Sequence, residues 1–160
     1  MKVNDQEFHI GLKAFIEHQN KLLILHSDPK GPYASSFWGM PGGKINTQET
    51  SASFETTLKR EIQEELGEDF KVTIGEVFYA WKFILPGKLP ILLLGISCKY
   101  LSGEISLSPE FDSYAWIEAD QHPTYSMLPG QAAAIEKWQK NLNYSCQRLS
   151  AATYRRLLNL

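Results

Sequence analysis

The stretch that most constrains this chain runs from Phe54 to Gly67 and has the periodicity of an amphipathic helix. Its apolar residues recur at every fourth position, at Phe54, Leu58, Ile62 and Leu66. At about 100° per residue, this spacing places them along one face of a helix. Gly67 directly follows the last of them and predicts a left-handed C-terminal cap, because glycine carries no Cβ penalty there. Ser51 or Ser53 is expected to cap the N-terminus, since a serine oxygen can accept a hydrogen bond from the first turn.

Acidic residues flank the apolar face of this helix. Glu61 and Glu65 lie along one border of the apolar arc, Glu64 lies beside them, and Glu65 points partly inward. Like charges at these spacings repel each other, and partial burial of a charge adds to the cost. A divalent cation would relieve the repulsion, and Mg²⁺ prefers such oxygen ligands. Arg60 lies one turn before Glu64 and is expected to pair with it; for so short a pattern alone, a solvated acidic face is the alternative.

The residues before the helix extend the pattern into a longer motif. Gly42-Gly43 follows an aromatic and proline-containing segment, and Glu49 stands between the two glycines and the helix. At this point the sequence resembles the Nudix hydrolase family, whose motif reads Gly, five residues, Glu, seven residues, Arg-Glu-apolar-X-Glu-Glu-X-Gly-apolar. The matching residues are Gly43, Glu49, Arg60, Glu61, Ile62, Glu64, Glu65 and Gly67. The resemblance covers roughly residues 11–120.

Two positions depart from the family pattern. Ten residues separate Glu49 from Arg60 where the family has seven, which places a three-residue insertion within residues 50–53. This insertion is expected to displace Glu49. The last motif position is usually apolar and is Glu68 here. This difference is expected to affect only how the following loop packs.

The resemblance implies a fold of the α/β class, the Nudix α-β-α sandwich around a mixed β-sheet, in a single domain over residues 1–160. It also implies a bound Mg²⁺, with Mn²⁺ as a substitute. The expected metal ligands are the backbone carbonyl of Gly42 and the side chains of Glu61, Glu64, Glu65 and Glu110, with Asp112 in reserve for Glu110. Two glycines in succession would bring that carbonyl close to the helix.

Two residues of the motif have expected catalytic roles. Glu64 is expected to deprotonate the attacking water, because a carboxylate outside the buried arc can reach solvent. Arg60 is expected to orient the acids. Trp38, Tyr79 and Trp81 are candidates for stacking on a nucleobase, with packing in the core as the alternative for each.

Alternating and apolar segments on both sides of the motif predict the sheet. Strands are expected over residues 8–17, 21–26, 72–83, 91–100 and 111–117, and helices over 130–140 and 147–158. The segment 91–100 is almost entirely apolar, which indicates a buried central strand. Residues 27–36 contain prolines, glycine and serines and predict a loop. The last helix would cover either the domain or a second subunit, so a homodimer stays open.

The whole chain limits the classes of partner. A net charge of −2 over 160 residues gives no basic surface for a long nucleic acid, and no segment reaches membrane-spanning length. Cys98 and Cys146 lack metal-ligand spacing and predict reduced thiols, and the N-terminus has no apolar signal core, so a cytoplasmic protein is expected.

The expected function is a Mg²⁺-dependent pyrophosphohydrolase. It would cleave the diphosphate linkage of a nucleoside diphosphate joined to another group, by metal-activated water. A domain of the same fold that senses a nucleotide without hydrolysing it is the alternative. A diphosphate isomerase would need a well-placed cysteine, and Cys98 lies in an apolar run that does not favour a nucleophile.

Overall fold

The computed structural model describes residues 5–32, 35–84 and 87–142. Its strands are β1 (His9–His18), β2 (Lys21–Ser27), β3 (Trp38–Gly39), β4 (Lys71–Phe83), β5 (Ile91–Ser102) and β6 (Phe111–Ile117). Its helices are α1 (Phe54–Leu66), the short 3₁₀ turns η1 (Thr47–Glu49) and η2 (Ala119–Thr124), and a helix at residues 131–142. None of the helices in these ranges is long and apolar enough to cross a membrane.

The strands form one mixed sheet. Its order is β3-β2-β1-β5-β4, and β6 pairs with β2 beside this path. β1 and β5 are parallel, whereas the remaining pairs are antiparallel. Gln19 and Asn20 join β1 to β2 with φ of 51° and 63°, the left-handed conformation of a two-residue hairpin turn. β5 lies between β1 and β4, so the apolar run predicted as a central strand occupies that position.

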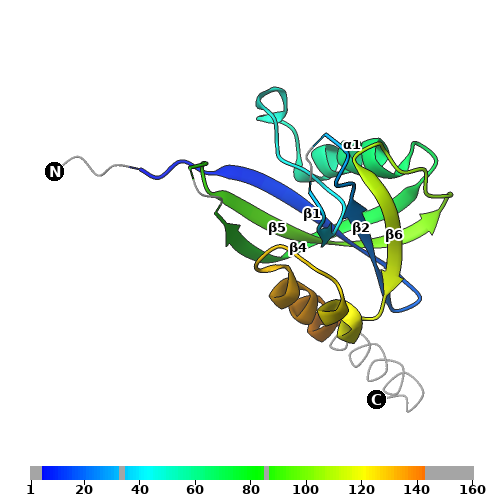
Figure 1. Cartoon of the computed structure of the whole chain (residues 1–160). Coiled ribbons are helices and arrows are strands. Elements are labelled where there is room, and N and C mark those ends of the chain that lie inside the picture. Colours follow the sequence, from blue (N-terminus) through cyan, green and yellow to red (C-terminus); the bar gives the residue numbers. More distant parts are fainter. Residues whose placement is uncertain (1–4, 33–34, 85–86, 143–160) are drawn as a thin grey trace, which may run out of the picture.

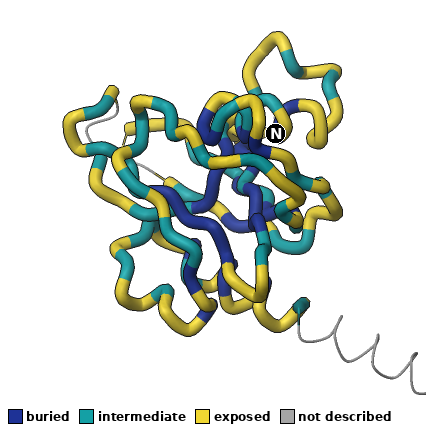
Figure 2. Tube along the Cα trace, turned by 90° about the vertical axis from the view of Figure 1, so that its right-hand side faces the viewer, coloured by how far each residue is buried: buried dark blue, intermediate teal, exposed yellow. Residues whose placement is uncertain are grey.

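Helical layers cover the two faces of the sheet, and Figure 1 shows α1 on one side and the helix at residues 131–142 on the other. Alternate residues of β1 and β2 point to opposite layers, because successive side chains of a strand alternate. The core on the α1 side includes Leu12, Ala14, Ile16, Leu23, Leu25, Leu58, Ile62 and Leu66. The core on the other side includes Phe15, Leu22, Ile24, Trp81, Ala134, Ile135 and Trp138. The buried positions follow the central strands (Figure 2), and the α-β-α sandwich is confirmed.

Helix α1 begins and ends close to the predicted positions. The side chain of Ser53 accepts a hydrogen bond from the Thr56 N–H at 3.1 Å, so Ser53 is the N-cap. Gly67 ends the helix with φ 96° and ψ 154°, which is a positive φ but not the predicted left-handed helical cap. Phe54 was expected in the apolar face and is 42% exposed. Thr57 is the buried residue of the first turn.

Strand β4 departs from the strict alternation predicted for residues 72–83. Its register against β5 shifts between Ile74 and Val77 and again between Val77 and Tyr79. The extra residue of a bulge changes which face the following side chains take. Phe78 therefore packs against Phe15, with ring centroids 4.8 Å apart, while Val77 is exposed.

The chain after β6 closes the second face. The helix predicted at 130–140 is present at residues 131–142, and its buried side chains belong to the core beneath the sheet. The helix predicted at 147–158 lies outside the described residues.

Candidate active site

The turn at Gly42-Gly43 lies directly between β1 and α1. The Gly43 carbonyl accepts the Leu12 N–H at 2.9 Å, which holds the turn on β1. Gly42 has φ 122°, and a Cβ there would lie 2.2 Å from the Leu12 carbonyl oxygen. A Cβ on Gly43 would lie 2.4 Å from Oε2 of Glu61. Gly42 therefore requires glycine, whereas a Cβ on Gly43 would displace the carboxylate of Glu61. The two glycines bring backbone within reach of the acids of α1.

Glu65 is the most buried acid of the site. Glu65 is only 7% exposed, and its Oε2 accepts the Gly42 N–H at 2.7 Å. Burial raises the pKa of Glu65 to about 7; Lys13 and the Gly42 N–H lower it, and the charges of Glu61 and Glu110 raise it further. Burial also raises the pKa of Glu61, against the lowering effect of Arg60. Two neighbouring carboxyl groups thus resist ionisation, which is unusual for groups without a functional reason.

Arg60 ties the acids of the motif together. Its guanidinium donates to Glu64 at 2.6 Å, as expected, and to Glu61 at 2.6 Å. It also binds both oxygens of Glu49, at 2.6 and 3.0 Å. The hydrogen bond to Glu49 is the main cause that raises the pKa of Arg60, and Arg60 in turn lowers the pKa of Glu49. Such a bidentate pair fixes geometry as well as charge.

The displacement of Glu49 from its family position stays a prediction, and the structure places Glu49 in direct contact with Arg60. η1 begins with a capping box, in which Asn46 accepts the Gln48 N–H and Glu49 accepts the Asn46 N–H. The loop before α1 extends outward near the start of that helix (Figure 1), and Glu49 at its base binds Arg60. A surface loop can lengthen at little cost in closure entropy, so the insertion predicted within residues 50–53 is compatible with this contact.

Lys13 belongs to the site and was not predicted. Its ammonium donates to the carbonyl oxygen of Met40 at 3.1 Å and to that of Gly42. The Gly42 carbonyl, expected to face a metal, therefore faces a cation that the chain itself supplies. Lys13 also lowers the pKa of Glu61 and Glu65. The available signal was a lysine in the middle of an otherwise apolar strand, a position where lysine is seldom found without a partner.

The acids do not converge on one point as expected. Across the described ranges, no group of three or more His, Cys, Asp or Glu side chains has the geometry of a metal site. Arg60 holds Glu64 at the surface, where its side chain is 58% exposed, while Glu65 is buried on the other side of Glu61. The donor type nevertheless fits a hard divalent cation. Burial and mutual repulsion disfavour the ionised acids, and a cation would offset both effects.

Glu110 and Asp112 take different positions. The charge of Glu110 is the last of the causes that raise the pKa of Glu65. Asp112 instead accepts a hydrogen bond from Nδ1 of His26 at 2.6 Å, and His26 lowers its pKa. Nε2 of His26 lies 3.2 Å from the Ser36 hydroxyl. Asp112 is thus engaged by His26, and Glu110, the first choice from sequence, stays a prediction for the further acid.

The three candidate aromatic residues lie in two different places. Trp38 is half-buried, with ring centroids 4.9 Å from His26 and 5.0 Å from Tyr125. Trp81 is 7% exposed and belongs to the core on the face opposite α1, and Tyr79 stacks on it at 5.9 Å. Trp81 does not line a base-binding cleft in this structure, because the helix at residues 131–142 covers it.

The fold and the acidic helix define the class of this protein as an α/β sandwich of the Nudix type. The model of the NUDIX domain matches residues 8–139, and the chain belongs to the Nudix family of hydrolases.

Known proteins of the family resemble the chain over most of its length. The nucleoside triphosphatase NudI of Klebsiella pneumoniae (strain 342) is 27% identical over 116 residues, which cover 66% of this chain and 77% of the relative. The crystal structure of a MutT protein from Methanosarcina mazei Go1 superposes with a TM-score of 0.71 at 22% identity, covering 88% of this chain and 99% of that one. An ADP-ribose pyrophosphatase from Streptococcus suis 89-1591 has a TM-score of 0.64 at 18% identity, covering 83% and 90%.

Proposed function

We propose that the protein is a Mg²⁺-dependent pyrophosphohydrolase that cleaves the diphosphate linkage of a nucleoside diphosphate joined to another group. The observation that carries this proposal is the pair of acids Glu61 and Glu65 against the Gly42-Gly43 turn, each with a raised pKa. Carboxyl groups that are difficult to ionise and lie beside a backbone turn are typical of a catalytic metal site. The relatives named above as a triphosphatase and a pyrophosphatase agree with cleavage of a phosphoric anhydride.

The proposed ligands of Mg²⁺, or of Mn²⁺ in its place, are Glu61, Glu64, Glu65, Glu110 and the Gly42 carbonyl. When bound, such a cation lowers the pKa of a coordinated water and neutralises charge that develops on the phosphate. Lys13, which now faces the Gly42 carbonyl, would then serve the phosphate oxygens as a positive neighbour.

Glu64 is the proposed general base. It is the most exposed of the three motif acids Glu61, Glu64 and Glu65, so its carboxylate can reach a water that enters from solvent. Arg60 holds this carboxylate at 2.6 Å and positions it relative to Glu49 and Glu61. In this role Glu64 accepts the proton of the attacking water, and Arg60 keeps the accepting oxygen in place.

Trp38 is the proposed contact for the nucleobase. Its half-buried ring lies against His26 and Tyr125, so an aromatic surface already exists beside it. Tyr79 and Trp81 are left out of the proposed contact, because they pack together in the core on that side of the sheet.

Turnover of a substrate panel tests the activity. The panel contains ADP-ribose, dinucleoside polyphosphates, nucleotide sugars and nucleoside triphosphates, each with Mg²⁺ and with a chelator. Glu64→Gln should lower kcat about a hundredfold or more for any substrate that is cleaved, as expected for loss of a general base. Glu55→Gln, on the exposed first turn of the same helix, is the matched control and should keep normal turnover. A loss below about tenfold in Glu64→Gln would remove Glu64 from that role.

A nucleotide sensor is the second candidate. It is favoured by one observation. Arg60 donates hydrogen bonds to Glu61 and Glu64, and Lys13 donates to the Gly42 carbonyl, so groups proposed as metal ligands already have partners within the chain. Calorimetric binding of a panel nucleotide with no Mg²⁺-dependent turnover of any member would establish the sensor. An isomerase is not supported, because Cys98 is buried and burial raises its pKa to about 12.

The proposed setting is the cytoplasm, where Cys98 would stay a reduced thiol. Light scattering on the purified chain would distinguish the monomer from the homodimer that the C-terminal sequence leaves open.

A further inference from the structure

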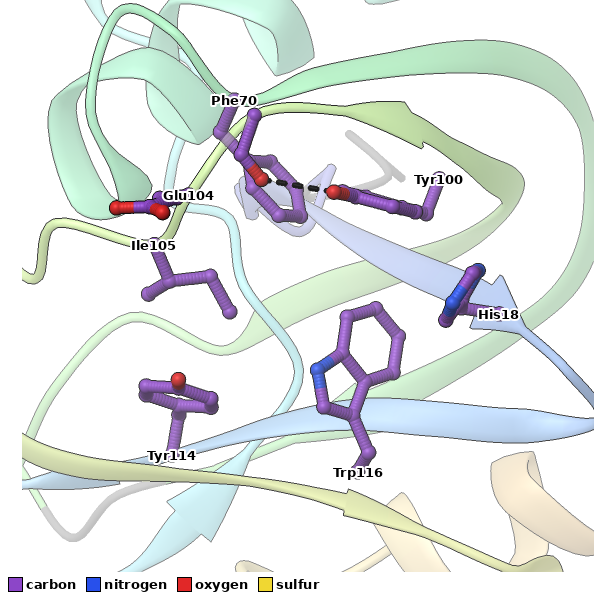
Figure 3. A pocket seen from close by; sticks show the side chains of 8 residues that line it. His18, Phe70, Tyr100, Glu104, Ile105, Tyr114 and Trp116 are labelled. Carbon is purple, nitrogen blue, oxygen red and sulfur yellow. Dashed lines mark hydrogen bonds between the residues drawn. The ribbon is translucent and has the colours of Figure 1, made fainter.

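A separate hollow of about 390 Å³ lies between β6, the end of β5 and the loop after it (Figure 3). Its lining is dominated by rings, and the residues that matter are His18, Phe70, Tyr100, Glu104, Tyr114 and Trp116. We call this hollow the aromatic cage. Phe70 is fully buried and forms its floor, whereas Tyr114 is exposed at its edge.

The rings of the aromatic cage meet as adjoining walls. Tyr100 stands at 73° to His18 with centroids 4.7 Å apart, and at 72° to Trp116 with centroids 6.0 Å apart. The hydroxyl of Tyr100 donates to the Gly103 carbonyl at 2.8 Å, which holds that ring in place (Figure 3). Rings that stand at such angles to one another present both faces and edges to their surroundings, and the face of an aromatic ring carries the negative part of its quadrupole.

The charge of the lining favours a cation. Glu104 is exposed at the rim, and no Lys or Arg is among the residues that line the hollow. Aromatic faces attract cations through the ring quadrupole, and a carboxylate at the mouth adds to that attraction. The same potential repels phosphate, so the aromatic cage is unsuited to the anionic part of a nucleotide.

The aromatic cage is distinct from the acidic site. His18 and Lys13 both lie on β1, five residues apart, which corresponds to about 17 Å along the strand. None of the lining residues belongs to the matched motif between Gly43 and Gly67. A ligand in the cage would therefore bind without occupying the acids of α1.

We infer that the aromatic cage binds a small organic cation with a methylated ammonium head, free in solution. The methyl groups would contact the ring faces of Trp116 and Tyr100, and the positive charge would lie toward Glu104. A methylated ammonium head is weakly hydrated, so it loses little hydration when it moves against the ring faces. A small inorganic cation is strongly hydrated and would lose more than the ring faces return.

Nuclear magnetic resonance titration of the full chain tests this inference. The probes are tetramethylammonium and choline, with 3,3-dimethylbutanol as the uncharged molecule of the same shape. Both cations should shift the indole N–H signal of Trp116 saturably, and the neutral alcohol should bind at least about threefold more weakly. The Trp116 signal is assigned from Trp116→Phe.

Two variants and one control locate the binding. Glu104→Gln and Tyr114→Ala change exposed side chains and should each weaken choline binding about threefold or more, with unchanged thermal unfolding. Phe37→Ala removes an exposed ring outside the cage and should leave the affinity unchanged. Absence of a saturable Trp116 shift, equal binding of the alcohol, or equal loss in Phe37→Ala would overturn the inference. These outcomes are independent of Mg²⁺-dependent turnover, so the proposed hydrolase activity stands or falls separately.

Discussion

The acidic site lies against the middle of β1, the aromatic cage lies at the C-terminal end of β1, and the two have opposite chemistry. The acidic site contains several carboxylates, held by one arginine and one lysine, and backbone closely packed at two glycines. The aromatic cage contains one exposed carboxylate and rings that contact each other without ion pairs between them. The first arrangement depends on charges that oppose burial, and the second depends on apolar contact. Substitutions in the acidic site and substitutions in the aromatic cage should therefore affect different properties of the protein.

The largest effect is expected from Gly42→Ala. The new Cβ would meet the Leu12 carbonyl oxygen at 2.2 Å, in a backbone with φ 122°, so both strain and a clash with β1 result. The free energy of unfolding should fall by about 3 kcal/mol or more, measured by urea denaturation.

Gly87→Ala is the control for backbone strain alone. Its φ is also positive, at 70°, but a Cβ there has no atom within 4 Å. This variant should lose only about 1 to 2 kcal/mol. Equal losses of unfolding free energy in the two variants would show that the close contact between Gly42 and β1 adds nothing to the cost of backbone strain.

The next effect concerns pH and Glu65. In the metal-free protein its pKa is about 7 against an ordinary 4.5, so the folded state retains a proton that the unfolded state releases between these values. Stability therefore falls as pH rises through this window, by up to about 3 kcal/mol. Glu65→Gln keeps an oxygen for the Gly42 N–H and should remove this part of the slope when unfolding is followed with a chelator from pH 4 to 8. An unchanged slope would contradict the assignment.

Arg60→Lys should have an intermediate effect, on turnover. Lysine cannot bind both oxygens of Glu49 while also reaching Glu61 and Glu64. A loss of about tenfold in kcat, with a smaller change in KM, is expected of a residue that positions the acids. Lys59→Ala changes the exposed neighbour and should keep wild-type kinetics. Wild-type kcat in Arg60→Lys would mean that a single positive charge suffices there.

The smallest effect is expected at the aromatic cage. Tyr100→Phe removes the hydrogen bond to the Gly103 carbonyl and should cost about 1 kcal/mol in unfolding free energy. Choline affinity should fall severalfold, because the wall is no longer held in place, while nucleotide turnover stays unchanged. A loss of turnover comparable to that of Arg60→Lys would show that the acidic site and the aromatic cage are coupled.

Much of the fold was predictable because it depends on local patterns. The spacing of four residues between Leu58, Ile62 and Leu66 predicted the buried face of α1. Gly67 marked the end of the helix, whereas the sequence left Ser51 and Ser53 open as its N-cap. The apolar run from residue 91 predicted the central position of β5. Phe54 and the alternation in β4 were predicted wrongly. The exposure of Phe54 and the bulges of β4 depend on how neighbouring elements pack, which a periodic pattern within one segment does not contain.

The sequence by itself determined the acidic helix, its pairing of Arg60 with Glu64 one turn apart, and the glycines that precede it. Only the tertiary structure decided the place of Glu49, the contact of Lys13 with the Gly42 carbonyl, and the aromatic cage. The reason is physical: contacts within one helix follow from its fixed repeat. Contacts among His18, Tyr100 and Trp116 depend on how three strands of different sequence position are arranged in space.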